Sequence, residues 1–241
     1  MTDLLFRTDA YLREAAATVV AADEAGIVLD RTPFYPRAGG QPGDTGRIRW
    51  DGGEVVITDT IKDPERGAIH VVAAGAHLPP PGTGIVSILD WERRLRHMRM
   101  HTTLHLLCSA MPGIYATGNQ IGAEKSRLDF DLPEPPAKEW FTERLNELIA
   151  GDHEVGERWI TEAELDANPG LVRTLSVQPP RGTGRVRLVR IGPEEAPVDL
   201  QPCGGTHVRR TSEIGRVEVT KMESKGRQNR RIHIVLAGDT P

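Results

Sequence analysis

Three histidines and a cysteine occur in two pairs with the same four-residue spacing. His101 and His105 belong to the segment HTTLH, and Cys203 and His207 belong to the segment CGGTH. Residues four apart on a helix lie on one face, one turn apart, so the first pair can reach a common ion. Imidazole and thiolate together form a donor set that suits zinc. The two pairs therefore predict one zinc ion per chain, with His101, His105, Cys203 and His207 as its ligands.

Residues next to these pairs argue against a zinc protease and leave other histidine and cysteine residues outside the ligand set. A zinc protease carries a glutamate directly after the first histidine as its general base, and Thr102 stands there instead. His97 extends the run of histidines, but steps of four drift around a helix, so we interpret it as an RNA contact or a hydrogen-bonded polar residue. The alternative for the four candidate ligands is a set of buried, hydrogen-bonded histidines with an inert thiol. We interpret Cys108, in its apolar surroundings, as such a thiol.

Sequence periodicity predicts the elements that position these pairs. Asp90 is suited to cap a helix that carries HTTLH and ends at Pro112 and Gly113. An amphipathic helix is expected to end before Gly151, and the segment WITEAELDANPG suits a short helix. The other segments after residue 90 favour strands: a hairpin over 114–132, strands at 185–191 and 197–200, and a terminal hairpin over 215–238. Helices mixed with hairpins, without βαβ alternation, predict an α+β domain over 91–241.

The first ninety residues have a different pattern. Short apolar segments alternate with turns, beginning with a hairpin over 18–29, and residues 31–46 are too rich in glycine and proline for a helix. Several short strands at this spacing suggest a small barrel or sandwich. We predict a small β-barrel domain over residues 1–90, which carries the glycine-rich segment.

Composition bounds the class of protein. The chain has 241 residues, of which 38% are hydrophobic and 27% charged, as in a soluble globular protein. Two cysteines are too few for a disulfide framework, and neither a signal peptide nor a membrane span is apparent, so a cytoplasmic location without membrane contact is expected. The net charge of −4 argues against nucleic-acid binding. However, arginines cluster at 93–99, 181–190 and 209–231, and local patches set a binding footprint. A GC-rich genome explains part of the preference for arginine over lysine, but not the clustering.

Four segments carry a resemblance to a known family. HTTLHLL, GNQIGAEKSRLDF and QPCGGTHV, with TPFYPRAGGQPGDTG upstream, resemble the editing domain of alanyl-tRNA synthetase and its free-standing AlaX relatives, in the same order along the chain. The glycine-rich segment makes the chain similar to the medium-length AlaX type. A synthetase's aminoacylation domain would need several hundred more residues. The segment KMESK resembles an ATP-site loop of other synthetases, but no nucleotide-binding fold surrounds it. We expect an ATP-independent trans-editing protein.

The resemblance implies a substrate and a reaction. The implied substrate is the acceptor end of tRNA(Ala) carrying serine or glycine, and the implied reaction is zinc-dependent hydrolysis of the aminoacyl ester. Zinc activates a bound water and polarises the ester carbonyl, or it holds the α-amino group. Four protein ligands would fill a tetrahedral zinc, which argues for a structural site unless a ligand is loose or the coordination expands.

The resemblance also implies roles for individual residues. Thr32 is suited to hydrogen-bond the serine hydroxyl, or it is only a turn residue before Pro33. Gln41 contacts the ester or the terminal adenosine, or caps its loop, and Gln120 lines the pocket. The glycines expected to let the loop backbone approach the substrate are Gly39, Gly40 and Gly43.

Charged residues complete the expected site. Asp129 orients a zinc-bound histidine, or it is an ordinary charge on a hairpin. The expected contacts to acceptor-stem phosphates are Arg93, Arg94, Arg96 and Arg99, although each of them taken singly also suits a solvated helix face.

Two other functions stay open at this point. One is a zinc-stabilised tRNA-binding module without catalysis, in which the ion only folds the domain. The other is a related aminoacyl-tRNA deacylase with a different amino-acid specificity, such as threonyl or small D-amino acid esters. The sequence also leaves open the choice between serine and glycine, the role of zinc, the arginines that contact tRNA, and whether the protein is a monomer or a dimer.

Overall fold

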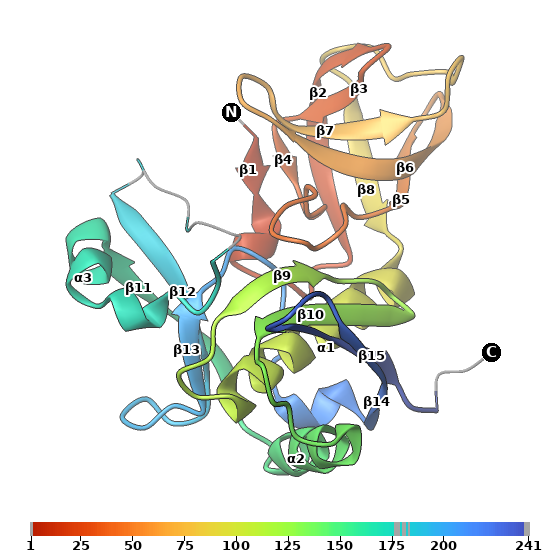
Figure 1. The fold of residues 1–241 in the computed structure, drawn as a ribbon. Helices are drawn as coiled ribbons and strands as arrows, with labels where there is room; N and C mark the ends of the chain where they lie inside the picture. Colours follow the sequence, from red (N-terminus) through yellow and green to blue (C-terminus); the bar gives the residue numbers. More distant parts are fainter. Residues whose placement is uncertain (1, 176–178, 180–181, 183, 239–241) are drawn as a thin grey trace. The chain divides into compact units, whose positions relative to one another are not determined.

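A closed β-barrel forms the centre of the N-terminal part of the chain (Figure 1). The structure is a computed structural model that describes residues 2–175, 179, 182 and 184–238. It divides into two compact units, Met1–His97 and Met98–Pro241, whereas the sequence placed the boundary at residue 90. The barrel strands follow the order β2-β3-β7-β6-β5-β8, which confirms the predicted barrel. Their bounds are β2 Glu14–Asp23, β3 Gly26–Leu29, β5 Gly46–Trp50, β6 Gly53–Asp63, β7 Gly67–Val72 and β8 Gly84–Leu89.

The barrel interior follows from alternation along its strands. On β6, Val55 and Ile57 are buried between exposed neighbours, and the register then shifts between Ile57 and Asp59. This bulge turns Thr60 to the buried side, where its hydroxyl donates to the Asp44 carbonyl at 2.9 Å. Further apolar side chains fill the same core: Val19, Ile27, Leu29, Phe34, Ile48 and Ile85.

The glycine-rich segment lies between two strands of this unit. A two-stranded parallel sheet joins β1, Asp3–Leu4, to β4, Arg31–Thr32, next to the short 3-10 helix Leu5–Arg7. The loop from Pro33 to Thr45 then leads into β5. Its tip is a tight turn in which Gly39 and Gly40 have φ of 58° and 86° and the flanking Ala38 and Gln41 form a bridge. Positive φ at both central residues favours glycine, so the sequence of the tip fits its geometry.

The helix that carries HTTLH is α1, Trp91–Ala110, and Pro112 and Gly113 follow it as predicted. Its last carbonyls are bound by Arg173, whose Nη2 donates to the Cys108 and Met111 oxygens at 3.0 and 2.9 Å. This contact satisfies groups that a helix end leaves unpaired.

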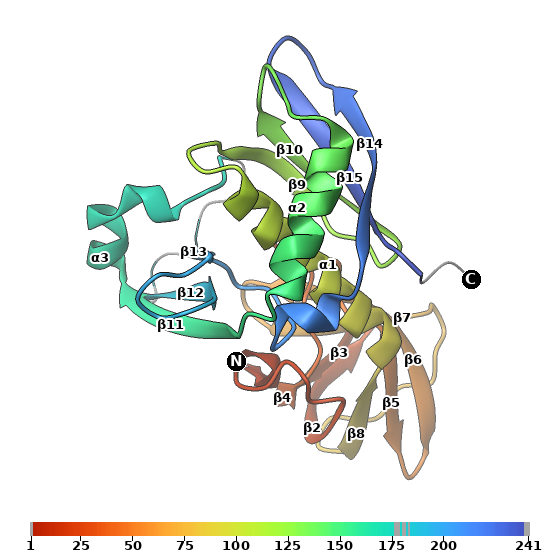
Figure 2. The ribbon, with the colours of Figure 1, turned by 90° about the horizontal axis from the view of Figure 1, so that it is seen from below.

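Two antiparallel sheets and two further helices complete the C-terminal unit (Figures 1 and 2). One sheet has the order β14-β15-β10-β9, and the other has the order β11-β12-β13. The helix α2 packs along β14 and buries Phe141 and Leu145 (Figure 2). The bounds are β9 Ala116–Gln120, β10 Lys125–Asp131, α2 Lys138–Ala150, β11 Val155–Thr161, α3 Glu162–Ala167, β12 Arg185–Ile191, β13 Asp199–Pro202, β14 Val217–Ser224 and β15 Asn229–Leu236, with 3-10 helices at Pro169–Leu171 and Thr211–Ile214.

These elements confirm the predicted α+β class, including the hairpins β9–β10 and β14–β15 and the short helix α3. Within the described ranges, no helix is long and apolar enough to cross a membrane.

Candidate metal centre

Two elements of the C-terminal unit bring the four predicted ligands together. His101 and His105 lie one turn apart on α1, and Cys203 and His207 lie on the turn that follows β13. The four donor atoms are all within 4.8 Å of one another. The Cys203 Sγ is 3.4 Å from the His101 Nε2 and 3.3 Å from the His207 Nε2. Zn–S and Zn–N distances of about 2.3 and 2.0 Å place tetrahedral ligands roughly 3.5 Å apart, so the donor set fits a zinc ion.

The electrostatics of the cluster favour metal-binding forms of two ligands. Burial by itself raises the pKa of the Cys203 thiol, but the adjacent His101 and His207 outweigh it and bring that pKa well below its ordinary value. Burial and the neighbouring His101 lower the pKa of His207 well below its usual range. Thiolate and neutral imidazole are the forms that coordinate a metal.

His105 differs from His207 because it has an anionic partner. Burial lowers its pKa, but hydrogen bonds to Asp199 and Cys203 outweigh burial and raise the pKa to about 10. The His105 Nδ1 lies 2.9 Å from the Asp199 Oδ2, and both side chains are buried. A metal ion that binds the other ring nitrogen displaces a proton from this imidazole.

A threonine performs the corresponding task for His207. The Thr102 hydroxyl donates to the Met98 carbonyl at 2.9 Å, so at 3.1 Å from the His207 Nδ1 it acts as an acceptor. This arrangement places the proton on Nδ1 and leaves Nε2 for an ion. The sequence singled out Thr102 only because it excludes a protease glutamate, and it gave no sign of this second contact.

The turn with Cys203 is held by its neighbouring strand. The Arg187 Nη1 on β12 donates to the Cys203 and Gly205 carbonyl oxygens at 2.9 and 3.0 Å, and its Nε donates to the Glu157 carboxylate at 2.7 Å. The Gly205 amide lies 3.4 Å from the Cys203 Sγ and donates to it. Neither Gly204 nor Gly205 has positive φ, so the turn does not depend on left-handed backbone.

The carboxylate at Asp129 has other partners. It accepts from the Arg231 Nε and Nη2 at 2.8 and 2.7 Å and from the Arg127 Nη1 at 2.9 Å. Burial raises the pKa of Asp129, but the two arginines outweigh it and lower the pKa. The carboxylate that contacts a candidate ligand is Asp199, so the interpretation of Asp129 as a hairpin charge describes the structure better. The sequence spacing could have indicated Asp199 as a neighbour of the site, because residues 199 and 201 share one face of a strand and Cys203 continues this alternation just after the strand.

Gln120 and Cys108 also lie in this unit. Gln120 is exposed at the end of β9, and its Oε1 accepts from the Arg127 Nε at 3.1 Å. Cys108 is buried, and burial raises the pKa of its thiol to about 12, which fits an inert side chain. His97, at the end of the N-terminal unit, is also buried.

Thr32 and Gln41 lie in the N-terminal unit, and both are almost completely buried. The Thr32 hydroxyl accepts the Phe34 amide at 3.1 Å and lies 2.7 Å from the His70 Nε2. The His70 Nδ1 is 2.9 Å from the Ile27 carbonyl, so Nδ1 carries the proton and Nε2 accepts from Thr32. The Thr32 side chain thus forms a turn at the start of the loop, which agrees with the alternative interpretation of Thr32 as a turn residue before Pro33.

Gly43 allows close packing of the loop. A Cβ there would lie 2.1 Å from the Thr60 carbonyl oxygen, so only glycine fits without a shift. The Gly39 and Gly40 turn supplies the tip described above.

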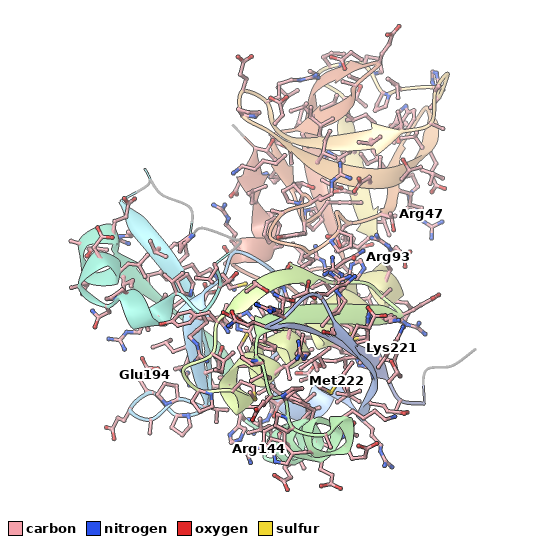
Figure 3. The ribbon with its side chains drawn as sticks, viewed as in Figure 1. Arg47, Arg93, Arg144, Glu194, Lys221 and Met222 are labelled. Atoms are coloured by element: carbon pink, nitrogen blue, oxygen red, sulfur yellow. The ribbon has the colours of Figure 1, made fainter. Side chains whose placement is uncertain are left out.

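Two of the four arginines proposed for phosphate contact this loop, and one of them, Arg94, is enclosed by it. Arg94 is completely buried: it forms an ion pair with Asp44 and donates to the Pro33 and Ala10 carbonyls at 2.7 and 3.0 Å. The Arg93 Nη1 donates to the Gly43 carbonyl at 2.7 Å, and Figure 3 labels this side chain. The burial of Arg94 contradicts a role in phosphate binding, because its guanidinium is enclosed by the loop.

The remaining two proposed arginines are partly exposed. The Arg99 Nε donates to the Ile214 carbonyl at 2.7 Å, and Arg96 lies on the same helix. Of the other basic clusters, Arg181 lies outside the described residues, while Arg187 and Arg231 hold the contacts given above.

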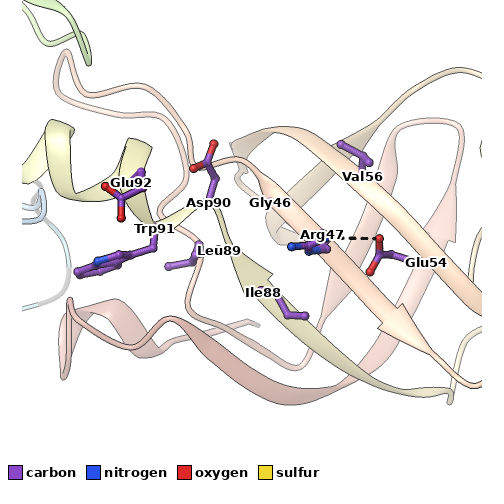
Figure 4. Close-up of a pocket in the computed structure, with 9 residues that line it drawn as sticks. All are labelled: Gly46, Arg47, Glu54, Val56, Ile88, Leu89, Asp90, Trp91 and Glu92. Carbon is purple, nitrogen blue, oxygen red and sulfur yellow. Dashed lines mark ion pairs between the residues drawn. The ribbon is translucent and has the colours of Figure 1, made fainter. Parts of the chain in front are cut away.

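A surface hollow of about 360 Å³ lies on the N-terminal unit, beside β5 and the start of α1 (Figure 4). Its charged side chains include Arg47 and Glu54, which lie 3.8 Å apart, and Asp90. It contains none of the predicted ligands and no arrangement of nucleophile and base, so the metal cluster is the better candidate for chemistry.

Two segments of the chain match models of known protein families. Residues 186–233, which include Asp199, Cys203 and His207, match the model of the threonyl and alanyl tRNA synthetase second additional domain. Residues 8–93 match the model of class II (A) tRNA synthetases. Parts of both units, including the segment with Cys203 and His207, therefore resemble domains of tRNA synthetases.

Individual relatives define the family. The chain is 37% identical to the alanyl-tRNA editing protein AlaX-M of Methanosarcina acetivorans over 98% of this chain and 99% of the relative. It is 30% identical to the AlaX-M protein of Saccharolobus solfataricus over 98% of this chain and 99% of the relative. An alanine–tRNA ligase of Pyrobaculum calidifontis is 37% identical over 91% of this chain, and that match covers 25% of the ligase. The chain belongs to the AlaX-M family of alanyl-tRNA editing proteins, which confirms the resemblance seen in the sequence.

Proposed function

We propose that this protein hydrolyses the ester of tRNA(Ala) that has been mischarged with serine. Water adds to the ester carbonyl carbon, the bond to the ribose oxygen breaks, and serine and a free tRNA 3′ end leave. The observation that carries this proposal is the cluster of His101, His105, Cys203 and His207 in a chain that matches alanyl-tRNA editing proteins over nearly its full length.

The metal is proposed to be one zinc ion per chain. It would supply a Lewis acid for the ester carbonyl or an anchor for the α-amino group. The chain's own contribution is to hold the donors. Thr102 and Asp199 occupy the Nδ1 atoms of two histidines, and the Gly205 amide donates to the sulfur of Cys203.

Selection of serine is proposed to involve the glycine-rich loop. A pocket rejects alanine if it offers a polar group that only the serine hydroxyl satisfies. Thr32 offers such a group, and because its proton is engaged by His70 it would accept a hydrogen bond from serine rather than donate one. Since Thr32 is completely buried, this contact requires the loop to move, and a purely structural role for Thr32 is the competing interpretation.

Gln41 and Gln120 are proposed to contact the ester end of the substrate, with Gly39, Gly40 and Gly43 shaping the loop beside it. Gln120 is exposed, and its Oε1 accepts a hydrogen bond from the Arg127 Nε. The partly exposed Arg93, Arg96 and Arg99 are the candidates for phosphate contacts.

A deacylation panel tests this function. Ser-, Gly- and Ala-tRNA(Ala) are incubated with the metal-loaded protein, with chelator-treated protein and with no protein. We expect hydrolysis of Ser-tRNA(Ala), little or none of Ala-tRNA(Ala), and loss of activity after chelation. A metal-loaded protein that binds tRNA(Ala) but leaves all three esters intact would instead be a zinc-stabilised binding module. Activity on threonyl or D-aminoacyl esters alone would establish a deacylase of another specificity.

A further inference from the structure

Strand β13 contributes more to the metal centre than the cysteine that follows it. Asp199 and Gln201 are buried on one face of this strand, where they pair with Ile191 and Val189 of β12, and Cys203 is the next residue in the alternation. Side chains two apart on a strand share a face. β13 thus places a carboxylate and an amide on the face from which the Cys203 thiol continues, just after the strand ends.

We propose that Asp199 is a positioning residue for the metal centre, which fixes the ring of His105 so that its Nε2 faces the ion. This inference rests on the metal site of the proposed function, although it does not depend on the substrate. The Asp199 Oδ2 lies 2.9 Å from the His105 Nδ1, and the exposed fractions of the two side chains are 1% and 7%. A histidine whose Nδ1 donates to a carboxylate is held in one tautomer and one orientation.

The carboxylate is itself fixed by a neighbour. The Gln201 Nε2 donates to the same Asp199 oxygen at 2.9 Å. A buried carboxylate without partners is strongly unfavourable, so an aspartate in this position needs these two donors. Gln201 therefore limits the rotation of Asp199, and Asp199 limits the rotation of His105.

Charge balance gives a second reason for an acid at this position. A zinc ion bound by one thiolate and three neutral imidazoles has a net charge of +1. Burying an unbalanced charge is unfavourable. The Asp199 carboxylate, which is hydrogen-bonded to His105, would bring the sum to zero. Asparagine at this position would retain a hydrogen-bond acceptor but would leave the bound centre positive.

The different partners of His105 and His207 predict which of the two contacts affects metal affinity more. A hydrogen bond to a carboxylate is stronger than one to a neutral hydroxyl. Asp199 should therefore affect metal affinity more than Thr102 does, although both engage an Nδ1 atom.

The matched control for Asp199→Asn is Asp129→Asn. Asp129 is a buried carboxylate of the same unit, with a side chain that is 12% exposed against 1% for Asp199, and its partners are Arg127 and Arg231 rather than a candidate ligand. The same substitution at both positions separates loss of a buried charge in general from loss of the contact to His105.

The first experiment measures the zinc affinity of the full-length protein by competition with a chromophoric chelator. We expect Asp199→Asn to bind zinc about 10- to 100-fold more weakly than the wild type, and Gln201→Leu and Thr102→Val to show smaller losses. Asp129→Asn should stay within about twofold. Affinity of Asp199→Asn within twofold of the wild type, or an equal loss in Asp129→Asn, would overturn the proposal.

The second experiment needs no substitution, so it applies even if Asp199→Asn does not fold. Nitrogen NMR of the zinc-loaded wild type, labelled in its histidines, should show His105 with a protonated Nδ1 and a metal-bound Nε2. Metal on the His105 Nδ1 would overturn the proposal. Zinc-loaded protein with the expected tautomer but without deacylase activity would contradict the proposed function and support this inference.

Discussion

At the scale of single residues, the four candidate ligands differ in how the protein prepares them. The cluster lowers the pKa of the Cys203 thiol, while Asp199 and Thr102 hold the outer nitrogens of His105 and His207. The other cysteine, Cys108, is buried, and burial raises the pKa of its thiol. The Cys203 thiol is therefore suited to bind a metal as a thiolate, whereas the Cys108 thiol stays protonated in the core.

This difference predicts unequal effects of the same substitution. Cys203→Ala should lose bound zinc, because it removes the only anionic donor of the cluster, and His101→Ala should do likewise. Cys108→Ala should keep one zinc per chain, at a stability cost of about 1 kcal/mol for the lost sulfur. Metal analysis of the purified variants measures this. Wild type that is free of metal yet fully active would contradict the site assignment.

The hydroxyl of Thr32 belongs to the same scale. If it accepts a hydrogen bond from serine, Thr32→Val should lower kcat/KM for Ser-tRNA(Ala) by one to two decades, about 1 to 3 kcal/mol, and should change Gly-tRNA(Ala) little. Thr32→Ser should retain most of the activity. Equal losses on both substrates would show that Thr32 only holds the loop through His70 and Phe34.

At the scale of elements, local sequence signals predicted what local forces determine. The non-helical segment 31–46, the end of α1 at Pro112 and the hairpins all follow from backbone preferences and alternation. The roles of Arg94 and Asp199 depend on contacts between segments far apart in the chain. Arg94 bonds to Asp44, 50 residues away, and His105 bonds to Asp199, 94 residues away. The sequence therefore predicts Arg94 as a phosphate contact within its cluster, although the side chain is buried against the loop.

The strand β7 carries a histidine that makes the barrel sensitive to acid. Burial lowers the pKa of His70 to about 4, against the ordinary 6.5. The unfolded chain thus binds a proton at His70 more readily than the folded chain does. The contribution of neutral, buried His70 to the free energy of unfolding is therefore fully present above pH 6.5 and is lost as the pH falls toward 4. The total effect is about 3 kcal/mol.

Urea unfolding followed by tryptophan fluorescence between pH 4 and 7 measures this dependence. His70→Gln should unfold with a shallower pH dependence than the wild type over that range, since one proton uptake is removed. The exposed His77→Gln is the matched control and should keep the slope of the wild type. Equal slopes in all three proteins would show that His70 titrates normally in the folded state.

At the scale of the whole molecule, net charge and local charge point in opposite directions. The formal net charge is −4, yet arginines are concentrated along α1 and on the strands of the C-terminal unit. Several of these arginine side chains form hydrogen bonds within the protein. Arg94, Arg173 and Arg187 each donate to backbone carbonyl groups, so a count of basic residues overstates the charge that a phosphate backbone meets.

Salt dependence measures how many cations are left for RNA. If Arg96 and Arg99 contact acceptor-stem phosphates, binding of tRNA(Ala) should weaken by one to several orders of magnitude between about 50 and 200 mM salt, because each phosphate contact releases counterions. Arg96→Ala should weaken binding for every tRNA sequence and reduce the salt slope by roughly one contact. Arg144→Ala on α2, where Arg144 pairs with Glu147 at 3.1 Å, is the matched control for loss of a partly exposed helical arginine and should leave the slope unchanged. The measurement is the dissociation constant of uncharged tRNA(Ala) at four or more salt concentrations. A slope that Arg96→Ala and Arg144→Ala alter equally would assign the effect to overall charge, and binding that does not respond to salt would place recognition in the amino-acid pocket alone.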